Sequence, residues 1–177
     1  MKTSALVKLS ACLLLSPFVS FAASSAAPAL NDANIAAIVV VANQIDIDAG
    51  KLAQKSASHA EVKGLGDMMV RDHTAVNQQA VDLVTKLKVT PQDNDLSKKL
   101  KADAEKTYDG LKAKKGAEFD RAYVANEIAY HEAVISVVET MLIPGAKNAE
   151  LKALLQQVLP AFHAHLAHAK HVQSLLK

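Results

Sequence analysis

Three histidines and one aspartate stand where the surrounding pattern predicts apolar side chains. His73 and His165 each interrupt a run of apolar residues spaced alternately by four and three, which is typical of a helix face packed in a bundle. His131 is bracketed by apolar residues, and Asp46 lies at the centre of an inward row on an earlier helix. Neutral imidazole suits Zn, Cu, Fe and Ni ions. The four residues are therefore a candidate metal site, with Glu127 as a candidate additional ligand.

A metal is one of three explanations for such a cluster. Burying an unpaired histidine costs about 1–3 kcal/mol, so several at one level must satisfy each other, bind water or bind a ligand. A carboxylate–imidazole hydrogen-bond network without metal also accounts for the pattern in full. The remaining explanation is a different ligand, or a helix register in which these residues do not face the core as inferred.

The other histidines near the C-terminus do not share this position. The stretch LPAFHAHLAHAKH, residues 159–171, contains four of the seven histidines. Only His165 falls on the apolar face, whereas His163, His168 and His171 lie off it. We expect these three to be solvated or to flank the bundle.

Long amphipathic helices must position the candidates, and the spacing predicts an all-α fold, a four-helix bundle. A long, partly helical connection, residues 92–116, joins the second and third helices. It is predicted to contain a weaker amphipathic helix that ends at Gly116. A capping box from Ser58 to Glu61 is predicted to start the second helix. The four helices are predicted at about residues 34–56, 58–88, 117–143 and 148–177.

The predicted hairpins place all four candidates at one level. At about 1.5 Å per residue, Asp46 and His73 lie roughly 20 Å from the hairpin that joins the first two helices. His131 and His165 lie roughly 21 and 25 Å from the hairpin that joins the last two. All four can therefore meet near the middle of the bundle.

The first 22 residues have the pattern of a secretory signal peptide. Two lysines precede an apolar run, and the small residues Ser20 and Ala22 predict cleavage after Ala22. Residues 23–30 are predicted to be a flexible segment and residues 31–177 the bundle domain. No later stretch is apolar enough for a transmembrane anchor. We therefore expect an exported protein, periplasmic or associated with the outer membrane.

Charge and cysteine content exclude two classes of function. The chain has 20 Lys and Arg against 18 Asp and Glu, and loss of Lys2 and Lys8 leaves 18 against 18, because residues 1–22 contain no acid. A neutral chain lacks the basic stripe that a nucleic-acid partner requires. Cys12 is the single cysteine and precedes the predicted cleavage point, so the mature chain has no disulfide or thiol chemistry.

Four segments carry a resemblance to a known family. They are GKLA (50–53), MMVRDH (68–73), EFDRAYVANEIAYHEAV (118–134) and LPAFHAHL (159–166). Through them, residues 31–176 resemble the ferritin-like family called domain of unknown function 4142, found in secreted bacterial proteins. The family more often has Glu where this chain has Asp46, and often Asp where it has Tyr130. The resemblance implies a four-helix fold and export but no known activity, and it places the recurring family residues at His73, His131, His165, Phe119, Asp120 and Tyr123.

The motifs favour a binding protein over an enzyme. Di-iron sites of helical bundles use Glu-x-x-His, which occurs at none of the three inward histidines, and no nucleophile motif is present. The leading hypothesis is an exported envelope protein that binds one transition-metal ion (Zn, Cu, Fe or Mn). The alternative is a structural or stress-related envelope protein with a metal-free polar core, and a redox metalloenzyme is the third hypothesis. The sequence leaves any envelope partner and the oligomeric state open.

The signal-like segment predicts that the exported protein begins at about Ala23. N-terminal sequencing of protein recovered from the envelope fraction measures this directly. An intact N-terminus, or a lipid attached to Cys12, would contradict the prediction.

Overall fold

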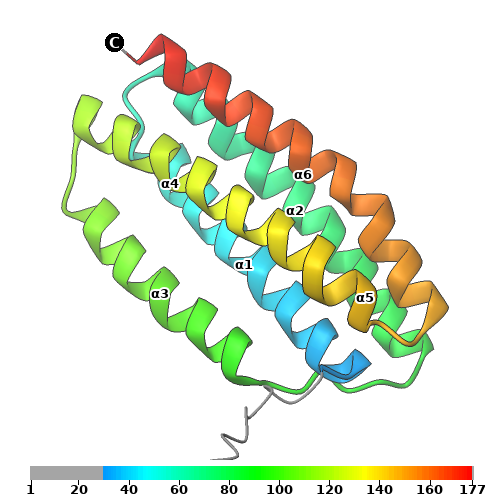
Figure 1. Cartoon of the computed structure of the whole chain (residues 1–177). Helices are drawn as coiled ribbons and strands as arrows, with labels where there is room; N and C mark the ends of the chain where they lie inside the picture. The colour runs from blue at the N-terminus through cyan, green and yellow to red at the C-terminus, as the bar shows by residue number, and fades with distance from the viewer. Residues whose placement is uncertain (1–29, 177) are drawn as a thin grey trace, which may run out of the picture.

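The computed structural model describes residues 30–176, which form a bundle of long helices (Figure 1). This part of the chain contains no β-strand, so the predicted all-α fold is confirmed. The predicted signal peptide, Cys12 and nearly all of the segment 23–30 lie outside the described residues. Among the helices of residues 30–176, none has both the length and the apolar composition needed to cross a membrane.

Four long helices make up the bundle. The first two form an antiparallel hairpin, and the last two form a second one (Figure 1). The third bundle helix extends through a π-helical turn, η1 (Val138–Leu142), and a short helix, α5 (Ile143–Gly145), before the chain turns back. The bundle helices are α1 (Asp32–Ser56), α2 (Ala60–Lys86), α4 (Gly116–Val137) and α6 (Ala149–Leu175).

The connection between α2 and α4 contains a full helix rather than the weak one predicted. This helix, α3 (Asp95–Lys112), packs against α1 and α4 on the outside of the bundle (Figure 1). It runs the length of the bundle, so α4 starts at the same end as α2 and runs parallel to it. The prediction that Gly116 ends this helix is wrong. Gly116 is instead the first residue of α4, with a φ of 56° in the left-handed region that glycine tolerates.

The prediction of a capping box from Ser58 to Glu61 is wrong, because Ser58 forms hydrogen bonds with a residue of α4 instead. The buried Asp120 accepts hydrogen bonds from the backbone amides of Ser58 and His59, each at 2.9 Å, and from the Ser58 hydroxyl. His59 is the N-cap of α2, and its side chain accepts from the Glu61 amide at 3.2 Å. Asp120 thereby ties the α1–α2 connection to the start of α4.

The core of the bundle is apolar at both ends and polar in the middle. One apolar half includes Leu142 and Leu155, and the other includes Met69 and Phe119. Each bundle helix contributes to both halves and, between them, at least one buried polar residue. We call this middle level the polar layer; its members are Asn43, Asp46, His73, Glu127, His131 and His165.

Close packing of α1 on α2 generates the first structural prediction, which compares two glycines of α2. A Cβ at Gly66 would lie 2.8 Å from the Ala53 Cβ and 2.9 Å from the Gly50 carbonyl oxygen, whereas a Cβ at Gly64 would meet nothing within 4 Å. We expect Gly66→Ala to lower the free energy of unfolding by about 1–3 kcal/mol through overpacking. Gly64→Ala is the matched control and should raise it by about 0.5–1 kcal/mol.

Chemical denaturation of the two variants measures both effects. Equal changes of the same sign would show that the α1–α2 spacing is not set by contact at Gly66.

Candidate metal centre

The structure places all four predicted ligands, and Glu127, inside the bundle at one level. The side chains of Asp46, His73, His131 and His165 come from α1, α2, α4 and α6, and each residue is at most 4% exposed. Glu127 is fully buried one turn before His131. The equal depths estimated from helix rise therefore correspond to a real meeting point.

Each of the three imidazoles holds one hydrogen bond to a fixed acceptor. An amide, carbonyl or carboxylate oxygen can only accept, so the ring nitrogen facing it carries the proton. The Asn43 oxygen is placed by its own amide nitrogen, which donates to the Val39 carbonyl at 2.8 Å. The three pairs are His73 Nδ1 with Asn43 Oδ1 at 2.8 Å, His131 Nδ1 with the Glu127 carbonyl at 3.0 Å, and His165 Nε2 with Asp72 Oδ2 at 3.1 Å.

The second nitrogen of each ring has no hydrogen-bond partner. These atoms are Nε2 of His73, Nε2 of His131 and Nδ1 of His165. The ring centroids are 5.1–5.6 Å apart, and one ring nitrogen of each histidine lies within 4.8 Å of one from each of the others. Because the outer nitrogens hold the protons, the unpartnered ones present lone pairs and cannot bond to one another.

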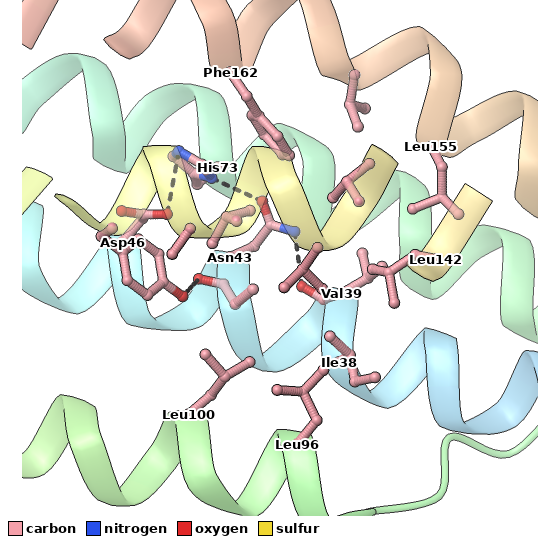
Figure 2. A pocket seen from close by; sticks show the side chains of 17 residues that line it. Ile38, Val39, Asn43, Asp46, His73, Leu96, Leu100, Leu142, Leu155 and Phe162 are labelled. Atoms are coloured by element: carbon pink, nitrogen blue, oxygen red, sulfur yellow. Dashed lines mark hydrogen bonds and ion pairs between the residues drawn. The ribbon is translucent and has the colours of Figure 1, made fainter. Parts of the chain in front are cut away.

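Asp46 lies close to this group of lone pairs. Its Oδ2 is 3.5 Å from His73 Nε2, a contact marked in Figure 2, although the two atoms form no hydrogen bond. Two ligand atoms at 2.0–2.1 Å from one tetrahedral ion are about 3.4 Å apart. Asp46 and His73 are therefore already spaced like two ligands of one ion.

Glu127 forms a carboxyl pair with Asp46 at the edge of the cluster. Burial, followed by the charge of Glu127, raises the pKa of Asp46 well above its usual value, and burial raises the pKa of Glu127 to about 7. The pair therefore keeps a proton at neutral pH when no cation is present. Both carboxylate oxygens of Glu127 and the buried hydroxyl of Tyr123 lack a hydrogen-bond partner.

Glu127 approaches His131 at the ring nitrogen that already has a hydrogen-bond partner. The Glu127 Oε2 atom lies 3.7 Å from Nδ1 of His131, and this nitrogen already donates its proton to the Glu127 carbonyl. Glu127 is thus placed as a neighbour of Asp46 and as the backbone acceptor that orients His131.

All three histidines are held in the neutral form. Burial lowers the pKa of His73 to about 2 and that of His131 to about 4, and it lowers the pKa of His165 as well. A neutral imidazole is the form that coordinates a metal. At pH 7 the polar layer therefore offers three ready nitrogen ligands.

The off-face histidines lie outside the cluster, as the spacing predicts. His163 is half exposed and pairs with Glu139 of η1 at 3.3 Å. His168 is partly exposed and His171 is exposed, with their ring centroids 6.3 Å apart.

Two residues that orient the ligands were missed or underrated by the sequence analysis. Asn43 was not singled out, although it lies three residues before Asp46 on the same helix face. The contact of Asp72 with His165 on α6 was not predicted either. Arg71 holds the Asp72 carboxylate at 2.7 Å. Spacing along one helix could have suggested Asn43, whereas the Asp72 contact depends on how α2 and α6 are rotated.

Comparison with known proteins supports both the family resemblance and the fold. The family model described as Domain of unknown function (DUF4142) matches residues 19–172. The solved structure of CopM in the Cu(II)-bound form is similar with a TM-score of 0.64 at 15% sequence identity, covering 84% of this chain and 99% of that chain. At this identity the likeness shows a shared fold. Comparison with curated protein sequences finds no match.

The raised pKa of Glu127 predicts a pH-dependent effect of Glu127→Gln in the metal-free protein. The ordinary pKa is 4.5 and the folded-state pKa is about 7, so the folded state binds this proton more tightly than the unfolded state. The stability gained from this tighter proton binding is complete below pH 4.5 and is lost as the pH rises through 7. Glutamine cannot ionise, so Glu127→Gln should raise the free energy of unfolding at pH 8 by about 1–3 kcal/mol, with little gain at pH 4.5.

Urea unfolding at the two pH values measures this difference. The control is Glu132→Gln on the exposed side of α4, which loses only a surface pair with Lys170 and should change stability by less than about 1 kcal/mol. An equal effect of Glu127→Gln at both pH values would mean that Glu127 does not change protonation between them.

Proposed function

This chain belongs to the DUF4142 family, and we propose that it binds one transition-metal ion in the polar layer. The ligands are His73, His131 and His165, with Asp46 as the fourth. Glu127 is the neighbouring carboxylate, available as an additional ligand. The observation that carries the proposal is the group of three buried imidazole nitrogens with free lone pairs at one level.

A metal satisfies this group better than water or a proton does. A water molecule has two protons, so it can satisfy at most two of the three lone pairs. Protonating an imidazole instead is opposed by burial, which lowers the pKa of His73 to about 2. One cation satisfies all of these acceptors at once.

The surroundings of the histidines support metal binding. Histidine ligands commonly donate their other ring N–H to a carboxylate, a carbonyl or a water, which fixes the tautomer and the ring orientation. Asn43, Asp72 and the Glu127 carbonyl are acceptors of this kind. The mixed use of Nε2 from two rings and Nδ1 from the third follows from where these acceptors lie.

The ligand types favour copper or zinc among the four metals considered. Imidazole suits both, and a closed set of three nitrogens and one oxygen fits a tetrahedral ion. Divalent copper binds most tightly in the usual affinity order, and manganese least. The Cu(II)-bound state of CopM, which has the same fold, also supports copper.

The proposed role is to hold the metal in the cell envelope rather than to catalyse a reaction on it. Four protein ligands leave no open coordination position, and an open position is what distinguishes catalytic from structural zinc sites. Export rests on the signal-like sequence of residues 1–22, with the periplasm or the outer membrane as the destination. The alternative is a structural or stress-related envelope protein whose polar layer only fixes the packing, and the same experiment decides between them.

Metal titration of the protein tests the proposal. Metal-free protein should bind one Cu(II) or Zn(II) per chain, and melting at 100 times the dissociation constant should show a stabilisation of about 2.7 kcal/mol. A double variant, His73→Ala with His131→Ala, should lose the ion and the stabilisation. Calorimetry and thermal melting give the two readouts.

Surface histidines supply the matched controls. Single variants His163→Ala, His168→Ala and His171→Ala remove an imidazole outside the polar layer, so each should keep the ion, whereas His165→Ala should weaken its binding. If the surface variants lose as much binding as His165→Ala, the ion lies on the surface. If no tested metal stabilises the wild type, the metal-free packing network stands.

A further inference from the structure

An apolar cavity of about 90 Å³ lies beside the polar layer, with walls from α1, α2, α3, α4, η1 and α6 (Figure 2). His73 and Asp46 form part of the wall at one end. Apolar side chains, among them Leu142, Leu155 and Phe162, form most of the remainder. The cavity therefore begins at two of the proposed metal ligands and extends into one apolar half of the core.

The cavity is accessible from solvent on the side where α3 lies beside α4. Ala133 of α4 is exposed and belongs to the wall, and Leu96 and Leu100 of α3 are only partly buried there. The wall of the cavity therefore reaches the protein surface between these two helices.

The wall gives water few partners. Asn43 donates to the Val39 carbonyl and accepts from His73, each at 2.8 Å, and the Tyr130 hydroxyl donates to the Ala42 carbonyl at 3.1 Å. The remaining polar atoms of the wall are those at the ligand end, on Asp46 and His73. Cavities lined by apolar groups stay dry and take up apolar solutes.

A π-helical turn forms part of the same wall. Val138 and Leu142, the first and last residues of η1, both line the cavity. Such turns are rare within α-helices and occur frequently at functional sites. The cavity and the irregular helix are thus two separate features that coincide next to the polar layer.

We propose that this cavity binds a small, uncharged, apolar molecule of the size of dioxygen. An engineered cavity of about 150 Å³ accepts benzene or xenon, so a cavity of about 90 Å³ suits a molecule of a few atoms rather than an aromatic ring. Occupancy of the cavity does not depend on a metal. That the molecule lies next to an ion held by His73 and Asp46 rests on the proposed function.

Xenon is the probe, and the metal-free protein is used so that the result does not depend on metal binding. Methyl NMR spectra under increasing xenon pressure should show saturable shifts for Ile38, Val138 and Leu142 in the wall. Val62 and Leu65 in the other apolar half should not shift. Dissolved dioxygen should enhance the relaxation of the same wall methyls, because it is paramagnetic.

Filling the cavity provides the variant test. Val138→Phe adds four carbon atoms to the wall and should weaken xenon binding at least tenfold. Ala133→Phe, at the exposed side of the cavity, is the second variant and should slow xenon exchange even if Val138→Phe fails to fold. Ala129→Phe is the matched control, because Ala129 is also exposed on α4 but lies outside the cavity wall, and it should behave as the wild type.

Two results would overturn the inference. One is the absence of saturable shifts in the wild type, and the other is equal shifts in both halves of the core. Both leave the metal titration unaffected, so failure of the cavity and failure of the metal site are distinguishable.

Discussion

Three buried imidazoles that meet inside the bundle, each with one ring nitrogen that has no hydrogen-bond partner, are the constraint on which the rest of the structure depends. A buried acceptor without a donor costs about 1–3 kcal/mol, so this arrangement persists only if the rings are held in place from outside. The rings are held by hydrogen bonds to Asn43 of α1, Asp72 of α2 and the Glu127 carbonyl of α4. Arg71 in turn holds Asp72, which extends the chain of contacts to the surface.

The polar layer also defines how the four helices are aligned. A purely apolar seam repeats every turn or two, and helices with such seams can slide past one another at modest cost. A polar group at a core position specifies register, because only one alignment satisfies it. Here all four bundle helices carry such a group, so sliding any one of them by a turn would separate its ligand from the other three.

Spacing along each helix was enough to predict the helical bundle and the burial of His73, His131 and His165, because apolar periodicity reports which face turns inward. It could not predict features that another helix decides. The residues around Ser58 have the sequence pattern of a capping box, but the Ser58 hydroxyl donates to Asp120 on α4. His59 is the N-cap of α2 instead. The same limit applies to Asp72, whose partner is on α6. Helix α3 was underrated because it packs with one side only and carries few apolar residues.

The four proposed ligands lie on four separate helices and are separated in the chain by 27, 58 and 34 residues, from Asp46 through His73 and His131 to His165. No single hairpin contains more than two of them, so neither a partly made chain nor an isolated fragment can assemble the set. Closing such long loops is slow compared with forming the helices themselves. On the proposed function, the four residues can hold an ion only after the last stage of folding, and the compartment in which the bundle folds decides which ions compete for the site.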